Sequence, residues 1–390
     1  MSDEVRRVPL AELGDLMAVA APLPFRVLDP QGRLLLAAGQ RIADERQLEA
    51  LRDRGACVEW PEVEALRRQR GGSGAGPGFE RVVRQETLFD RWEHFVWKLD
   101  GLLRGLGGEG AQAAAIDDLV SQQIALVDRD ADAALFLCMR QDDHRFALYG
   151  LAHALHTATG VLLASRLLGW TPAAQRSLVG AALTMNAAIV ELQGRMAEQQ
   201  EPPTKKQMDA IRGHPERAVE LLRAAGVTDE AWLMAVQDHH ERPGPGGYPR
   251  GGEPRSEGAR LLRGTDVLMA KVSPRALRAA MLPQEAARQL FRDEGGGPVA
   301  GSIIKAIGVH PPGDLVRLKN GEAAIVVQRA AGGRAAQVAV LQDARGRPVN
   351  DAPRRDTGKP EHAIAGMVPA AERTNLPRVL PEQVYGLLAP

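Results

Sequence analysis

Two adjacent histidines, His239 and His240, have an acidic residue on either side and stand directly before a segment rich in proline and glycine. Neighbouring residues on a helix point about 100° apart, so both imidazoles can reach one site only where the helix stops. The Pro- and Gly-rich segment predicts that stop. Imidazole and carboxylate groups are common metal ligands. This helix end is therefore a candidate metal site, and a chance polar helix end is the alternative.

Length and composition limit the number of domains and the classes of molecule that the protein could bind. At 390 residues, the chain is long enough for two or three domains. Its 49 basic and 49 acidic residues cancel, which argues against a general nucleic-acid or anionic-membrane surface. Cys57 and Cys138 are too few for a disulfide framework, so a reducing cytosol is expected.

The hydropathy of the chain also favours a cytosolic protein. The charged N-terminus lacks the apolar core of a signal peptide. The most apolar stretch, Leu178 to Leu192, is too short to span a bilayer and predicts one buried helix. We expect a soluble, cytoplasmic protein with no membrane segment.

The first 70 residues predict a small α/β domain. The segment Pro30-Gln-Gly lies between two short apolar runs and is a hairpin signal. Residues Asp44 to Arg54 have helical spacing before Gly55. A glycine-rich stretch over 71–78 predicts a flexible linker and a domain boundary.

Residues 79–310 predict a mostly helical domain, because apolar residues recur at spacings of three and four. Thr171 before a proline is an N-cap signal, and Thr204 opens a possible capping box. Gly226 predicts the end of the helix that follows His214-Pro215. We expect Thr228 to cap the helix that runs into the paired histidines.

The pattern changes after residue 310. Lys319-Asn320-Gly321 separates two apolar runs and predicts a β-hairpin, and a third strand follows near residue 337. Residues 311–348 are therefore predicted as a small β appendage. We expect a mobile, Pro-rich tail over 349–390. The fold class is mostly α, with a helical core, a mixed N-terminal unit and a short β appendage.

The paired histidines also carry a family resemblance. His239-His240-Glu241-Arg242 followed by Gly247-Tyr248-Pro249 resembles the HHE and GYP elements of the HD-GYP domains, bacterial metal-dependent phosphodiesterases that hydrolyse cyclic di-GMP. The likeness covers about residues 145–310. It implies an HD-domain-like helical core and a role in cyclic di-GMP signalling.

The resemblance implies roles for further residues in family order. The metal ligands that it implies are His153, His214, His239, His240 and Asp266. It implies substrate contacts from Gly247, Tyr248, Pro249, Arg275 and Arg278. In the family, the second metal of the pair corresponds to His214, His239 and His240, which are enough ligands for one Fe, Mn or Zn ion.

The sequence departs from the family where its His-Asp signature and following Lys should stand, because those positions hold Met185, Asn186 and Ile189. The thioether of Met185 suits neither Fe nor Mn in a hydrolytic site. The neutral amide of Asn186 cannot bridge two cations as a carboxylate does, and Ile189 has no charge to offset a phosphate. Since two-metal hydrolysis needs both ions, we expect the rate to fall by orders of magnitude.

Three functions remain open at this point. The leading prediction is a catalytically degenerate HD-GYP protein, a pseudoenzyme that acts by binding a cyclic dinucleotide, one metal ion or a signalling protein. The first alternative is residual single-metal phosphodiesterase activity, with Asp266 or Glu241 assisting a general-base step. The second is a structural scaffold that binds neither ligand. The sequence leaves a homodimer open.

Overall fold

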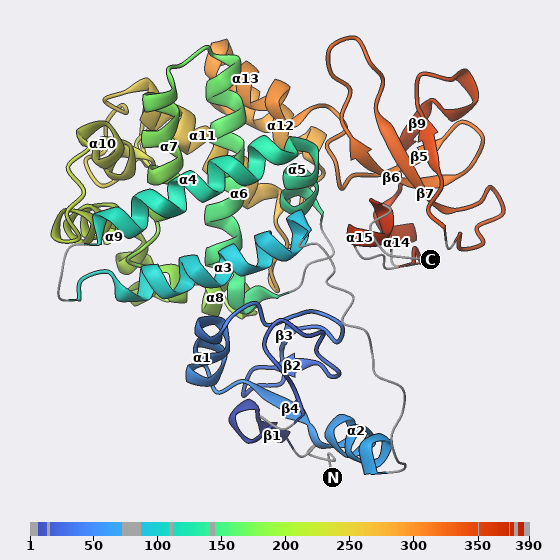
Figure 1. Ribbon diagram of the computed structural model, residues 1–390. Helices are drawn as coiled ribbons and strands as arrows, with labels where there is room; N and C mark the ends of the chain where they lie inside the picture. Colours follow the sequence, from blue (N-terminus) through green and yellow to red (C-terminus); the bar gives the residue numbers. More distant parts are fainter. Residues whose placement is uncertain are drawn as a thin grey trace. The chain divides into compact units, whose positions relative to one another are not determined.

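The computed structural model describes residues 7–13, 16–71, 87–108, 112–140, 145–349, 351–373, 375–377 and 381–385 (Figure 1). The chain divides into two compact units, Met1–Gly101 and Leu102–Pro390. This division falls inside helix α3 (Leu88–Gly105) rather than at the predicted linker. Residues 72–78 of that linker lie outside the described residues.

The first unit contains a small antiparallel sheet with strand order β1-β4-β2-β3. Its elements are β1 (Arg7–Pro9), η1 (Leu10–Glu12), β2 (Val27–Leu28), β3 (Leu34–Leu36), α1 (Glu45–Asp53), β4 (Cys57–Glu59) and α2 (Trp60–Gly71). The predicted hairpin is present, because β2 pairs with β3. The Asp29 carboxylate accepts hydrogen bonds from the backbone N–H groups of Gln31 and Arg33 and so holds the turn. The predicted helix is also present, and Asp44 caps α1.

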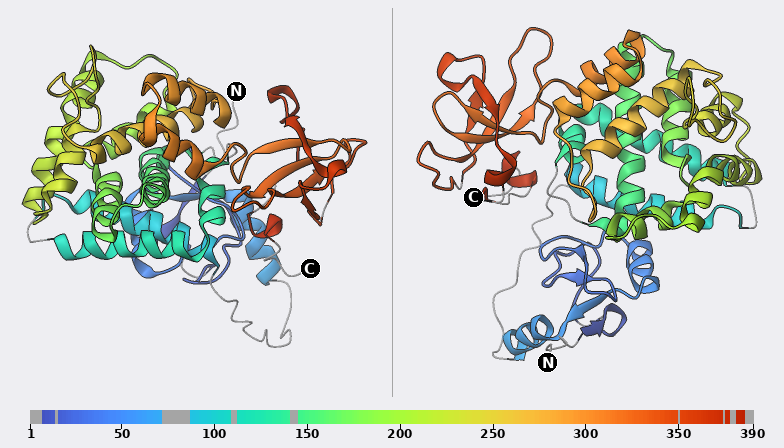
Figure 2. Two further views of the ribbon diagram at one scale, coloured as in Figure 1. Left: turned by 90° about the horizontal axis from the view of Figure 1, so that it is seen from above. Right: turned by 180° about the vertical axis from the view of Figure 1, so that it is seen from behind.

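The second unit consists largely of helices, as Figures 1 and 2 show. The helices are α4 (Ala113–Arg129), α5 (Ala131–Met139), η2 (Phe146–Leu148), α6 (Tyr149–Leu167), α7 (Pro172–Thr184), α8 (Val190–Glu198), α9 (Lys205–Ala224), α10 (Glu230–Asp238), α11 (Glu257–Val272), α12 (Pro283–Asp293) and α13 (Gly297–Ile307). Helix α6 is buried along most of its length and packs against α7, α11 and α13. It forms the centre of the helical core.

Helix α6 belongs to the most apolar long helical segment of the described residues. Together with η2 it forms a run, Phe146–Leu167, whose length and composition would allow it to cross a membrane. However, 78% of its most apolar window is buried inside the protein. The same apolar composition is required of a helix that other helices surround.

Two features of the helical domain correct the sequence expectations. The stretch Leu178 to Leu192 is not one helix, since α7 ends at Thr184 and α8 begins at Val190. Hydrophobicity cannot distinguish a buried turn from a buried helix. The N-cap of α10 is Asp229, whose side chain accepts from the backbone N–H of Trp232, and not Thr228.

Other helix boundaries match the expectations. Thr171 caps α7, which has a proline in its first turn, and Thr204 forms the capping box of α9 with Gln207. Gly226, with φ of 92°, follows the C-cap of α9. A side chain at this positive φ would be strained, which is why glycine favours this position.

The C-terminal part of the second unit is a five-stranded antiparallel sheet with order β8-β7-β6-β5-β9. Its elements are β5 (Leu315–Leu318), β6 (Ala323–Gln328), β7 (Gln337–Gln342), β8 (Arg354–Asp356), η3 (Pro360–His362), β9 (Ile364–Met367), α14 (Ala370–Arg373) and α15 (Pro381–Val384). The predicted β5–β6 hairpin is present. The prediction of a tail beyond 349 is corrected, because β8 and β9 form the two edges of the sheet. Short edge strands carry little apolar signal, and their pairing partners lie far away in sequence.

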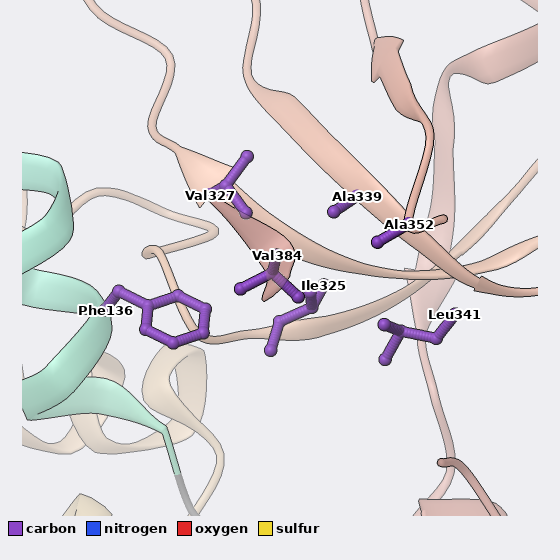
Figure 3. Close-up of a cluster of buried hydrophobic side chains, with 7 residues drawn as sticks. All are labelled: Phe136, Ile325, Val327, Ala339, Leu341, Ala352 and Val384. Atoms are coloured by element: carbon purple, nitrogen blue, oxygen red, sulfur yellow. The ribbon is translucent and has the colours of Figure 1, made fainter. Parts of the chain in front are cut away.

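One buried apolar cluster joins this sheet to helix α5 (Figure 3). Its members are Phe136, Ile325, Val327, Ala339, Leu341, Ala352 and Val384. Tyr385 packs edge-on against Phe136, with ring centroids 5.3 Å apart, and its hydroxyl donates to the Val327 carbonyl. The sheet therefore packs against the helical domain. The mostly α fold class is confirmed.

Candidate metal centre

The ends of two helices bring three imidazoles together. His214 lies in α9, while His239 is the C-cap of α10 and His240 follows it. The predicted helix stop is thus present, and it allows both neighbours to reach one site. One ligand atom of each imidazole lies within 4.8 Å of those of the other two. We call His214, His239 and His240 the imidazole cluster.

Backbone contacts fix the orientation of two of these rings. The Nδ1 atom of His214 lies 2.6 Å from the Ile211 carbonyl, and the Nδ1 atom of His239 lies 2.6 Å from the Val236 carbonyl. A carbonyl oxygen only accepts, so each Nδ1 carries the proton and donates it. Each Nε2 is then left with a lone pair. This arrangement orients histidine ligands in many metal sites.

Burial keeps the cluster uncharged. It lowers the pKa of His214 to about 3, with a further contribution from His239. Burial also lowers the pKa of His239. The pKa of His240 is well below its usual value because of burial, and then because of repulsion from His239. All three imidazoles are therefore neutral near pH 7, which is the form that binds metal ions.

The spacing of the donor atoms fits a single ion. The Nε2 atoms of His214 and His239 lie 3.1 Å apart. Two nitrogens that each bind zinc at about 2.0–2.1 Å in tetrahedral geometry are about 3.3 Å apart. Two lone pairs facing each other this closely repel unless a cation lies between them. Zn, Fe or Mn held by these three residues would have an open coordination position.

No carboxylate belongs to this cluster. Among the residues that the structure describes, His214, His239 and His240 form the one group of three or more His, Cys, Asp or Glu side chains close enough to share an ion. A second ion would need a bridging group, and none is supplied here.

The other two implied ligands bind each other. Nε2 of His153 lies 2.7 Å from Oδ1 of Asp266, and both side chains are buried. Burial alone would raise the pKa of Asp266, but the hydrogen bond and charge of His153 outweigh it and the pKa is lowered. Asp266 is therefore ionised, and one of its oxygens is bound to the His153 ring. This pair would have to separate before either side chain could bind an ion.

The segment from Met185 to Ile189, where the resemblance would place the family signature, lies in the buried turn after α7. Met185 is fully buried, while Asn186 and Ile189 are 5% and 8% exposed. The backbone N–H of Ile189 donates to the Asn186 carbonyl, which closes the turn. The three residues are thus part of the core of the helical domain.

Sequence reasoning missed Tyr149, which lies one helical turn before His153 on α6. Its ring stacks on that of His153 with centroids 5.6 Å apart and an angle of 8°. The guanidinium of Arg275 lies over the Tyr149 ring, with its carbon 4.6 Å from the ring centroid, and donates a hydrogen bond to the Tyr149 hydroxyl. The spacing of four residues between Tyr149 and His153 is a signal that could have found this contact.

The two predicted arginines lie in one tight turn after α11. The backbone N–H of Arg275 donates to the Arg278 carbonyl, and the reverse bond closes the turn. Arg275 contacts Tyr149, whereas the guanidinium of Arg278 donates to the Ala270 carbonyl. Both retain N–H donors that a phosphate could accept.

Tyr248 of the GYP segment covers the third imidazole. Its ring stacks on His240 with centroids 4.5 Å apart and an angle of 27°. It also lies 6.4 Å from the ring of His214. The predicted GYP segment therefore lies at the imidazole cluster.

The Glu241 side chain, expected as a possible assistant in a general-base step, is bound to the loop after α10. The residue is fully buried, and its carboxylate accepts from the backbone N–H groups of Arg250, Gly251 and Gly252. These three bonds take most of the roughly four lone-pair sites of the carboxylate. Glu241 is therefore engaged with the loop.

These features define a class: a mostly α protein with a helical domain in which three imidazoles converge. No family model matches the sequence. Over 226 residues, the chain is 25% identical to the cyclic di-GMP phosphodiesterase PA4108 of Pseudomonas aeruginosa, covering 57% of this chain and 54% of that protein. The chain thus spans about half the length of this curated relative.

One solved structure is also similar. It is described as Bd1817, a HDG"Y"P protein from Bdellovibrio bacteriovorus, and the match covers 76% of this chain and 97% of that chain, with 12% identity and a TM-score of 0.48. The sequence relative is named for the activity that the HD-GYP resemblance implies. The predicted resemblance to HD-GYP proteins is therefore confirmed.

Proposed function

We propose that this chain is a cyclic-dinucleotide signalling protein that binds one divalent ion at the imidazole cluster and has lost efficient hydrolysis of cyclic di-GMP. The observation that carries the proposal is the donor set itself: three neutral imidazoles converge, and no carboxylate of the described residues joins their group. The similarity to a cyclic di-GMP phosphodiesterase supports the choice of ligand.

The proposed loss of efficient hydrolysis rests on the groups that would have to hold a second ion. Hydrolysis at a two-metal site uses one pair of ions to hold the attacking hydroxide and to stabilise the phosphoryl charge. Here Asn186 offers a neutral amide in place of the bridging carboxylate, and Asp266 is engaged with His153. A single ion, when bound, would supply positive charge for a phosphate oxygen.

The chain's remaining groups argue against efficient single-metal catalysis. A general base needs a free acceptor within hydrogen-bond reach of its proton. Glu241 is occupied by three backbone N–H groups, and Asp266 by His153. Each carboxylate is already held by these bonds, so neither is positioned as a dedicated general base for a bound water. This favours a binding protein over an enzyme with residual activity.

The ligand contacts that we propose come from two arginines and from the tyrosine that stacks on the cluster. Arg275 and Arg278 offer guanidinium N–H groups to the phosphates, and Tyr248 offers a ring face to a base. A nucleotide bound there would act by changing how the protein contacts a signalling partner.

The test measures turnover and binding on the same purified protein. We expect no cyclic di-GMP hydrolysis by chromatography with added Mn, Fe or Zn, and a rise in melting temperature when cyclic di-GMP is added. In Arg278→Gln, the affinity should fall about ten- to a hundredfold, because a charge-assisted hydrogen bond contributes about 1.5–3 kcal/mol. Arg345→Gln, an exposed arginine in the loop between β7 and β8, is the matched control and should bind as the wild type does.

Two outcomes would contradict the proposal. Turnover at the rate of active phosphodiesterases would show that hydrolysis survives. Absence of both bound metal and a nucleotide-dependent shift would favour a scaffold that binds neither ligand.

A further inference from the structure

Two acidic residues flank the paired histidines, and both are buried. Asp238 and Glu241 are each 0% exposed. Residues three apart lie on one face at the end of a helix. The two carboxylates can therefore point to the same side, while the two histidines between them point toward the imidazole cluster. A buried carboxylate is costly unless charge or hydrogen bonds compensate it.

Glu241 is compensated by consecutive backbone groups. Its carboxylate accepts from Arg250 N at 2.6 Å, Gly251 N at 3.0 Å and Gly252 N at 2.9 Å. Successive N–H groups that converge in this way form an anion-binding nest. In the loop after α10, residues 250–252 are therefore bound to Glu241 at the start of the loop.

Asp238 makes a second attachment to the same loop. It accepts from the backbone N–H, Nε and Nη2 of Arg255, at 2.9, 2.8 and 2.8 Å, and from Nη2 of Arg250 at 3.1 Å. Charge-assisted bonds of this kind are roughly twice as strong as neutral ones. Both acids thus hold residues 250–255 against the end of α10.

Between these attachments, the chain passes closely over Glu241. A Cβ atom on Gly247 would lie 3.1 Å from Oε2 of Glu241 and 2.9 Å from the backbone N of Arg242. The next residue, Tyr248, donates its N–H to the His240 carbonyl at 3.4 Å and stacks on the His240 ring. The position of the loop therefore decides the position of Tyr248 on the third imidazole.

We propose that Asp238 and Glu241 form a loop clamp that positions Tyr248 on His240 and thereby controls the orientation and accessibility of the third metal ligand. The clamp itself depends only on contacts within the loop. Its effect on the metal ion rests on the proposed function. Glu241 is in this account a positioning residue.

The first test is limited proteolysis of the metal-free full-length protein. Trypsin cuts after arginine, and Arg242, Arg250 and Arg255 all lie in the loop. We expect Glu241→Gln to speed cleavage after these residues at least about tenfold, because it replaces an acceptor oxygen with an N–H donor. Glu253→Gln, an exposed carboxylate in the same loop, is the control and should be cut at the wild-type rate. Equal cleavage of Glu241→Gln and wild type would overturn the clamp.

A second variant covers the case in which Glu241→Gln does not fold. Gly247→Ala places a methyl group against the clamp and leaves both carboxylates in place. It should also be cut faster than the wild type. If this folded variant is cleaved at the wild-type rate, the proposed close contact between Gly247 and Glu241 would be contradicted.

The second test asks whether the clamp acts through Tyr248. Co(II) affinity and the visible spectrum of bound Co(II) are measured for Glu241→Gln, Tyr248→Ala and the double variant. We expect each single change to weaken binding about tenfold and the double variant to be no weaker than either, because both act through one contact. Additive losses would overturn this link. If the wild type binds no Co(II), the proposed function fails, and the proteolysis result still decides the clamp.

Discussion

The clearest test of the single-ion site compares His240→Ala with His153→Ala. His240 belongs to the imidazole cluster, whereas His153 is bonded to Asp266 outside it. The structure therefore predicts that only the first change removes the metal ion. It also predicts one equivalent of bound metal in the wild type.

The size of the effect follows from the binding free energy. An ion present at a hundred times its Kd stabilises the folded protein by about 2.7 kcal/mol. Even outer-shell changes weaken metal binding about 10- to 100-fold, so we expect loss of the direct ligand His240 to cost at least about a hundredfold. At the same ion concentration, the stabilisation would then fall to about 0.4 kcal/mol. The unfolding entropy is about 2.1 cal/mol/K per residue, so 1 kcal/mol shifts the Tm of a unit as long as Leu102–Pro390 by about 1–2 °C. A shift of about 3–5 °C should therefore shrink to less than about 1 °C.

His153→Ala should behave in the opposite way. It leaves the buried Asp266 without its partner, so the metal-free protein should lose roughly 3 kcal/mol of stability. Its metal-dependent shift should remain, because the cluster is intact. This variant thus separates a stability defect from a binding defect.

Thermal unfolding with and without Zn(II), together with elemental analysis after gel filtration, measures both quantities. Two equivalents of zinc in the wild type would refute the single-ion reasoning. An undiminished zinc-dependent shift in His240→Ala would refute the assignment of this ligand.

Two further predictions concern stability. Thr184→Val should cost about 1–3 kcal/mol in urea unfolding, because it leaves the buried Nε1–H of Trp232 without its acceptor at 2.9 Å; an unchanged midpoint would contradict this. Burial would raise the pKa of Glu322, but hydrogen bonds from Arg355 and Asn320 outweigh it and the pKa is lowered. The folded state therefore favours the ionised form, so Glu322 contributes stability above its ordinary pKa of about 4.3 that is lost as the pH falls through the lower folded value. Glu322→Gln should remove this part of the acid sensitivity, which urea unfolding at pH 7 and pH 3.5 would measure; the same pH dependence in both proteins would contradict it.

The sequence predicted the features that depend on neighbouring residues. The hairpin turn at Pro30, the N-caps Thr171 and Thr204 and the turn at Gly321 all appear in the structure. Each depends on contacts within a few residues, so the residue types themselves carry the information. The one N-cap that was misplaced, Thr228, was misplaced by one residue, because the adjacent Asp229 is also a good cap.

The sequence could not predict the features that depend on distant partners. Strands β8 and β9 are short and gain their stability from β7 and β5. The carboxylate of Glu241 beside two histidines suggested chemistry, yet its partners are backbone groups nine to eleven residues later. Backbone donors leave no signature in residue type.

By itself, the sequence determined which side chains are available: three histidines whose imidazoles could hold an ion, and a neutral Asn186 at the position where the resemblance would place a carboxylate. The tertiary structure decided how they are used. It turned the Nε2 atoms of His214 and His239 toward each other, paired Asp266 with His153, and bound Glu241 to the loop. The physical reason is that a buried polar group must find a partner within hydrogen-bond distance, and only the fold decides which groups lie that close.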